Sequence, residues 1–128
     1  MFHPFAELLG IQVIETKDGI SKSTLEVTEQ LYNPNKVLHG GVLYSLADTG
    51  MGAALVPTLE EGMLCATIEM KINYYRPVLT GTLVCISKIV NKGRTIANME
   101  ASIYRGEKLV ATANGNFSIF PRRPKKEK

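Results

Sequence analysis

An aspartate within an apolar run is the first residue of this 128-residue chain that could do chemistry. Asp48 is the one charged residue between positions 42 and 56. A carboxylate in apolar surroundings is costly unless a partner donates hydrogen bonds to it, and such carboxylates often act as general bases or nucleophiles. The other interpretation places Asp48 on a polar side of a helix, with Ser45, Thr49 and Gly52, facing solvent or capping a loop. The pattern alone leaves both interpretations open.

A second group of candidates lies just upstream, where Asn33 is followed six residues later by His39-Gly40-Gly41. Two glycines at the start of a helix would leave backbone N–H groups unpaired, with the positive end of the helix dipole behind them. Such donors stabilise the oxyanion that forms when a carbonyl group is attacked, and the Asn33 amide could add another donor. The alternative is a tight entry into the helix, with Asn33 in an Asn-Pro-Asn turn.

His39, Ser45 and Asp48 invite comparison with a Ser-His-Asp triad, which we reject. The three residues follow one another along a single predicted helix and its start. A nucleophilic serine is instead presented on a strained turn such as GxSxG, and this chain has no such motif. We expect His39 to shape the loop by hydrogen bonding or to contact the acyl carbonyl.

The elements that must position these residues begin with a short helix over 4–10 and two strands over 11–16 and 20–28. Asp18-Gly19 between those strands is a hairpin signal, because glycine tolerates the positive φ of a tight primed turn. The run over 42–56 is apolar nearly all round, which predicts a buried helix. Gly50 and Gly52 weaken helix propensity, which is understandable if a sheet presses closely on that face.

The second half of the chain changes to period two, the pattern of strands with one buried face. Ile68, Met70, Ile72 and Tyr74 alternate with polar residues and predict a strand over 67–75 with these four side chains facing inward. Further strands are predicted over 82–90, 95–103 and 109–119, the last with Leu109 at the start of its inner face. The expected fold class is α+β, with one buried helix wrapped by an antiparallel sheet. A long open strand edge favours dimerisation edge to edge.

Composition is that of one domain, residues 1–120, followed by a basic, solvated tail over 121–128. Apolar residues make up 45% of the chain. The tail holds five of the fifteen basic residues, so the nearly neutral body gives no reason to expect a nucleic-acid partner. Two histidines and two cysteines without a CxxC pair suggest no metal site. No apolar stretch approaches the roughly 20 residues of a membrane span, and no secretory leader is visible, so we expect a cytoplasmic protein.

Several segments carry a resemblance to a known family. Residues 33–50, with Leu38-His39-Gly40-Gly41 and Leu46-Ala47-Asp48, resemble the signature of hotdog-fold acyl-CoA thioesterases of the phenylacetate-degradation (PaaI-like) type. Residues 67–78 and 81–84 look like the strands that follow the helix in that family, and the resemblance covers roughly residues 5–120. It implies one central helix wrapped by five or six strands. It also implies homodimers that share one continuous sheet, often paired into homotetramers, with active sites at the subunit interface.

The resemblance also assigns roles to five residues. Asp48 matches the acid that activates water or attacks the thioester, and Thr67 stands where relatives place a hydroxyl beside it. Gly40 matches the residue whose backbone N–H polarises the thioester carbonyl. Asn33 matches the amide that orients the substrate or the water, and His39 has a supporting role. Asp48 and Thr67 of one chain are expected to act with Asn33, His39 and Gly40 of another.

The expected activity is therefore hydrolysis of an acyl-CoA to the free acid and CoA, with no cofactor beyond the substrate. One alternative is a hotdog module that binds and senses acyl-CoA without turning it over, although a sensor has no need of Asp48. A hotdog hydratase or dehydratase would carry a different helix motif. The sequence leaves open the acyl group, which depends on side chains such as Tyr44, Met51, Met63 and Tyr74. It also leaves open CoA or acyl carrier protein as the carrier, and Arg76, Lys92, Arg94 or the tail as the phosphate ligands.

Overall fold

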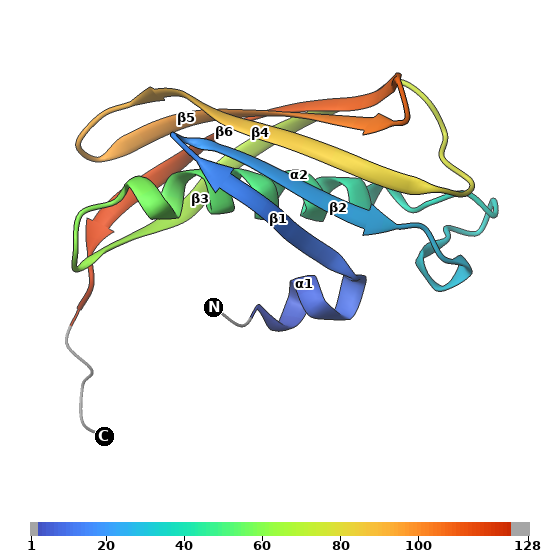
Figure 1. The fold of residues 1–128 in the computed structure, drawn as a ribbon, viewed down its shortest axis with the longest axis horizontal. Coiled ribbons are helices and arrows are strands. Elements are labelled where there is room, and N and C mark those ends of the chain that lie inside the picture. The colour runs from blue at the N-terminus through green and yellow to red at the C-terminus, as the bar shows by residue number, and fades with distance from the viewer. Residues whose placement is uncertain (1–2, 124–128) are drawn as a thin grey trace.

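The computed structural model describes residues 3–123, which form one long helix against a six-stranded sheet (Figure 1). All pairings are antiparallel, and the strand order is β1-β2-β4-β5-β6-β3. The predicted α+β hotdog layout is confirmed, with six strands. None of the helices in this part of the chain is long and apolar enough to cross a membrane. The elements in chain order are α1 (Pro4–Leu9), β1 (Ile11–Lys17), β2 (Ile20–Glu26), η1 (Glu29–Leu31), α2 (Gly40–Leu55), η2 (Val56–Thr58), β3 (Met63–Tyr74), β4 (Thr82–Lys92), β5 (Ile96–Arg105) and β6 (Lys108–Pro121).

Helix α2 is the centre of the core and runs along the inner face of the sheet (Figure 1). Leu46, Met51 and Leu55 are completely buried, as a helix that is apolar nearly all round should be. The sheet comes closest at Gly50, whose carbonyl accepts a 2.6 Å hydrogen bond from Ser21 Oγ. A Cβ at Gly50 would lie 2.5 Å from Ser87 Oγ, so the predicted close contact is confirmed there.

Gly52 does not share that explanation. A Cβ at this position would meet nothing within 4 Å. Gly52 lies with Ser45, Asp48 and Thr49 on the side of α2 that is only half buried. The sheet therefore requires a glycine at position 50 and leaves space for a side chain at position 52.

The hairpin between β1 and β2 has the predicted turn. Asp18 and Gly19 have φ values of 52° and 77°, and Lys17 pairs directly with Ile20. Two consecutive residues with positive φ define the primed turn whose twist matches that of the flanking strands.

Strand β3 departs from the simple alternation predicted for it. Its pairing with β6 shifts between Thr67 and Glu69, which makes Ile68 an extra, bulged residue. The inward prediction is therefore wrong for Ile68, which is 53% exposed, although Met70 is buried as predicted. The shift leaves Thr67 and Met70 on the helix side of the strand. The bulge thus changes which side chain faces α2, and this determines the candidate site.

Strand β6 starts and ends differently from its prediction. A second irregularity, between Ile103 and Tyr104, makes Val110 the buried residue, while Leu109 is only half buried. At the other end, Pro121 still pairs with Met63, so the sheet includes the first residue of the segment predicted as a tail. The rest of that prediction concerns Arg122 and Arg123, which follow the strand, and residues 124–128, which lie outside the described residues.

Candidate active site

Asp48 and Thr67 form the first part of the candidate site. Asp48 lies midway along α2 and is half buried, and Thr67 faces it from β3 because of the bulge at Ile68. Thr67 Oγ1 donates a 2.6 Å hydrogen bond to Asp48 Oδ1. The other carboxylate oxygen has no hydrogen-bond partner among residues 3–123, so it is free to accept a proton or contact a substrate. Asp48 thus lies on the polar side of α2, as one interpretation predicted, and also has a specific hydrogen-bond partner; its role as a base or nucleophile stays a prediction.

Gly40 and His39 form the start of α2. His39 is the N-cap residue, and its Nδ1 accepts a 2.8 Å hydrogen bond from the Gly41 N–H. The Val42 N–H bonds to the His39 carbonyl. The Gly40 N–H is left without a partner in the described part of the chain. An unpaired N–H at the positive end of a helix can polarise a carbonyl oxygen.

Asn33 forms the turn that one of the two sequence interpretations predicted, and its amide group stays available for the other. Its Oδ1 accepts hydrogen bonds from the backbone N–H groups of Asn35 (2.9 Å) and Val37 (3.3 Å), which folds the loop before α2. Its Nδ2 has no protein partner within the described residues. The side chain therefore holds its own loop with the oxygen and keeps the amide N–H groups available.

Tyr74 also belongs to this end of the site, and sequence reasoning named it only as a pocket residue. Its hydroxyl donates a 2.8 Å hydrogen bond to the Gly40 carbonyl, and a Cβ at Gly40 would lie 3.1 Å from the phenol ring. Burial, with a smaller contribution from Tyr44, raises the pKa of the Tyr74 phenol, so it remains a donor at neutral pH. The alternation in the sequence placed Tyr74 on the helix side of β3. What it could not show is that the end of β3 meets the start of α2.

The rejected triad is absent from the structure as well. Ser45 Oγ donates to the Gly41 carbonyl at 2.8 Å, and His39 Nδ1 is bonded to the Gly41 N–H. Neither side chain bonds to Asp48, so no relay of protons connects the three residues.

Cys65 is the other nucleophilic side chain near Asp48. Burial raises the pKa of the Cys65 thiol, and the negative charge of Asp48 raises it further. A thiol that keeps its proton is a poor nucleophile. No group of three or more His, Cys, Asp or Glu residues within positions 3–123 is arranged to hold a metal ion. These observations leave Asp48 as the candidate base or nucleophile.

The site residues fall into two groups on one chain. We call Asp48 and Thr67 the acid half-site, and Asn33, His39, Gly40 and Tyr74 the amide half-site. Gly40 and Asp48 are eight residues apart on α2, or about 12 Å at 1.5 Å per residue. Hydrogen bonds are about 3 Å long, so no single atom can bond directly to both the Gly40 N–H and the Asp48 carboxylate of the same chain.

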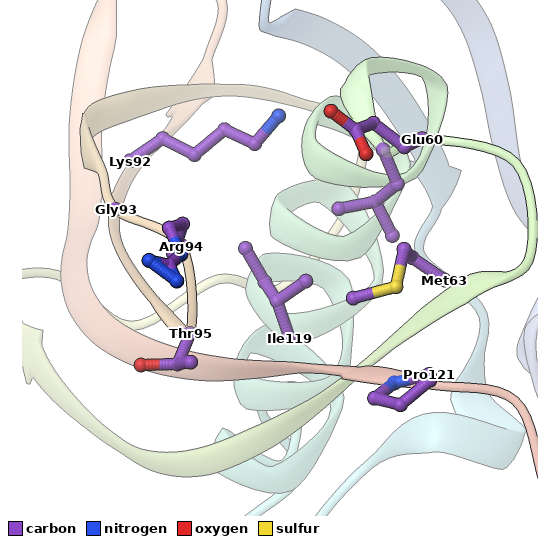
Figure 2. Close-up of a pocket in the computed structure, with 9 residues that line it drawn as sticks. Glu60, Met63, Lys92, Gly93, Arg94, Thr95, Ile119 and Pro121 are labelled. Atoms are coloured by element: carbon purple, nitrogen blue, oxygen red, sulfur yellow. The ribbon is translucent and has the colours of Figure 1, made fainter.

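One cavity adjoins the amide half-site, and another lies apart from both half-sites. A cavity of about 300 Å³ opens beside Gly40 and is lined by Leu38, Gly40, Leu43 and residues 74–78. A cavity of about 380 Å³ lies beyond the C-terminal end of α2 (Figure 2). Met63, Ile119 and Pro121 form apolar walls of the second cavity, and Glu60, Lys92 and Arg94 supply its charges. Of the other two residues named for pocket depth, Met51 is fully buried, and Tyr44 is 37% exposed and lines neither cavity.

Comparison with known proteins identifies the family. The profile of the Thioesterase superfamily matches residues 35–112. Acyl-coenzyme A thioesterase PaaI of Escherichia coli (strain K12) is 30% identical over 112 residues, covering 86% of this chain and 78% of that protein. Conserved protein PA5202 from Pseudomonas aeruginosa has a similar structure, with a TM-score of 0.90, 34% identity, and coverage of 94% of this chain and 96% of its own. The structure of thioesterase HI1161 from Haemophilus influenzae is also similar, with a TM-score of 0.87 and 28% identity. The match covers 91% of this chain and 82% of HI1161.

The predicted resemblance is thus confirmed over most of the chain. The match begins at residue 35 in the loop before α2 and covers α2, β3, β4, β5 and the start of β6. The chain therefore belongs to the thioesterase superfamily and is a thioester hydrolase with the hotdog fold of the PaaI-like type.

Proposed function

We propose that this protein hydrolyses acyl-CoA thioesters to the free acid and CoA, with Asp48 as the group that drives the attack. The hydrogen bond from Thr67 to one oxygen of Asp48 carries this proposal, because it fixes the carboxylate and leaves the other oxygen free. That oxygen takes a proton from water while the water oxygen bonds to the thioester carbon. The C–S bond then breaks, and CoA leaves as a thiolate. A thiolate is a good leaving group, so no strong general acid is needed to protonate it. Direct attack by Asp48 on the thioester is the alternative route.

The amide half-site complements this chemistry. Negative charge develops on the carbonyl oxygen during the attack, and the unpaired Gly40 N–H is suited to receive it. The free amide of Asn33 can hold the water or the substrate, and His39 fixes the start of the helix through Gly41. Neither half-site calls for a cofactor.

Each complete site would then need two chains, because the half-sites of one chain are too far apart. Strand β3 offers a way to join them. It lies at one edge of the sheet and is 12 residues long. Pairing β3 with β3 of a second copy would satisfy its open hydrogen-bonding groups and place Thr67 beside another subunit. We expect a homodimer, or a pair of dimers, as the active form.

The test is release of free thiol from a panel of acyl-CoAs by the wild-type protein and by Asp48→Asn. We expect turnover of at least one acyl-CoA by the wild type, and a loss of about 10²-fold or more in kcat in Asp48→Asn. Binding of acyl-CoA without turnover by the wild type would support a sensor instead. Equal rates for the two proteins would remove Asp48 from the mechanism.

A further inference from the structure

We infer that Arg76, Arg105 and Lys108 form a binding site for the phosphate groups of CoA; this inference rests on the proposed function. The three residues, which we call the cation cluster, line a cavity of about 220 Å³ together with Pro77 and Val110. Arg76 follows β3, and the other two residues flank the turn between β5 and β6. Their convergence is the observation that carries the inference.

The cation cluster has no anionic partner on the described part of the chain. The one ion pair within residues 3–123 joins Lys88 to Glu100. Glu107 lies in the turn between Arg105 and Lys108 but neither lines the cavity nor pairs with them. Three cations around one cavity repel one another and create a positive potential there. A ligand with several negative oxygens would relieve that repulsion and form charge-assisted hydrogen bonds.

Arg105 is held ready for such a ligand. Its Nε donates to the Thr80 carbonyl, and its Nη2 lies 3.4 Å from Thr80 Oγ1. These contacts fix the plane of the guanidinium group while part of its donor set stays free. A donor that is already oriented loses less conformational freedom when it binds phosphate.

The position of the cation cluster relative to Gly40 fits the shape of an acyl-CoA. Arg76 and Pro77 line both this cavity and the cavity beside Gly40, so the two adjoin. Tyr74, which bonds to Gly40, pairs with Ala111 of β6. Lys108 and Ala111 pair with Arg105 and Ile103, which are two residues apart on β5, so they lie about 7 Å apart along the strand at 3.4 Å per residue. The extended pantetheine arm of CoA is longer than this, so an acyl-CoA with its carbonyl at Gly40 can reach the cation cluster.

The rival cations, Lys92 and Arg94, are less suited to this role. Lys92 Nζ donates a 2.7 Å hydrogen bond to the Thr58 carbonyl, as Arg105 does to another backbone carbonyl, so this contact does not distinguish the two sites. Glu60 shares their cavity, and Figure 2 shows the Lys92 side chain extending toward the Glu60 side. An acid in the lining opposes the binding of phosphate.

The experiment compares acyl-CoA with the same acyl group on pantetheine, which lacks all phosphates. We expect Arg76→Ala and Lys108→Ala each to raise the KM for acyl-CoA roughly tenfold, because each substitution removes a charge-assisted hydrogen bond to phosphate. The kcat, and the KM for acyl-pantetheine, should not change. Lys22→Ala, on the outer face of β2, is the matched control and should behave as wild type. Equal KM values of the wild type for both substrates would overturn the inference and leave the hydrolase intact.

Direct binding separates the inference from the proposed function. Titration of free CoA into the catalytically silent Asp48→Asn protein requires no turnover, and adding Lys108→Ala should weaken binding by the same factor. If Lys108→Ala leaves the CoA affinity unchanged, the inference is overturned. It is also overturned if Arg94→Ala weakens CoA binding and Lys108→Ala does not. The same variants can also be assayed with the acyl group on acyl carrier protein. If Lys108→Ala lowers activity toward this substrate and not toward acyl-CoA, the cation cluster binds an acidic protein, and the inference is overturned. Failure of the wild type to hydrolyse either thioester would count against the proposed function alone.

Discussion

At the scale of single residues, the bulge at Ile68 determines the chemistry of the site. Without the extra residue, Thr67 and Met70 would not both face α2. Because of the bulge, the Thr67 hydroxyl contacts Asp48 and the Met70 side chain packs into the core from the same strand. A strand with strict alternation would have offered Asp48 a different neighbour.

The hydroxyl of Thr67 can be tested by keeping its shape and removing its oxygen. We predict that Thr67→Val lowers kcat roughly 10- to 100-fold, because a hydrogen bond to a charged group contributes about 1.5–3 kcal/mol. Thr67→Ser keeps the donor and should retain most of the activity. Steady-state kinetics with one acyl-CoA would check this, and a fully active Thr67→Val would show that Asp48 needs no such partner.

Tyr74 is predicted to position the amide half-site through the Gly40 carbonyl. Tyr74→Phe keeps the ring over Gly40 and removes one hydrogen bond, worth about 0.5–1.5 kcal/mol, so kcat should fall about 2- to 10-fold. KM should change less than kcat, because the phenol holds the backbone and not the substrate. Tyr44→Phe is the control, since the Tyr44 hydroxyl makes only a 3.4 Å contact with the Met70 carbonyl. Equal effects of the two substitutions would contradict this role.

At the scale of elements, the contact between α2 and the sheet is tightest at Gly50. We predict that Gly50→Ala destabilises the fold by about 1–3 kcal/mol, because the new methyl group would overlap Ser87. Gly52→Ala meets no neighbour and should stabilise α2 by up to about 1 kcal/mol through helix propensity. Urea denaturation of the two variants measures the difference. Similar effects at both positions would show that the sheet does not press on Gly50.

Cys85, on β4 beneath α2, should make the stability of the sheet depend on alkaline pH. Burial raises the pKa of its thiol from 9.0 to about 11, although a hydrogen bond with Ser87 opposes the rise. The folded chain then keeps a proton that the unfolded chain loses above pH 9, so this stabilisation is complete below pH 9 and is lost toward pH 11. The loss should be about 2–3 kcal/mol. Denaturation at several pH values should show a steeper decline in the wild type than in Cys85→Ala, and parallel curves would contradict the prediction.

Local sequence patterns were enough to predict most of the helices and strands, but not their contacts. The apolar run predicted α2, Asp18-Gly19 predicted the first hairpin, and alternation predicted the inner face of β5. These features depend on local preferences, which each segment carries in its own residues. The bulge at Ile68 depends on the fit between β3 and β6, and no local signal in the sequence marks it. The link between Tyr74 and Gly40 joins residues 34 positions apart, and only the folded chain brings them together.

At the scale of the whole molecule, the site is divided along α2. The resemblance predicted that Asp48 and Gly40 of different chains act together, and a separation of about 12 Å along one helix is compatible with that prediction. Strands β1 and β3 are the two edges of the sheet, and β3 carries Thr67. A second copy can pair with an edge that carries part of the candidate site, so we expect assembly to be a condition for activity.

Mixing two inactive variants tests this division most directly. Asp48→Asn disables the acid half-site, and Asn33→Asp disables the amide half-site while keeping the oxygen that folds the loop. After the two variants are unfolded together and refolded, half of the dimers should be mixed, each with one intact site. Thiol release should then recover to about a quarter of the wild-type rate, as random pairing of a two-fold dimer requires. Activity that stays at the level of the separate variants would contradict a site built from two chains.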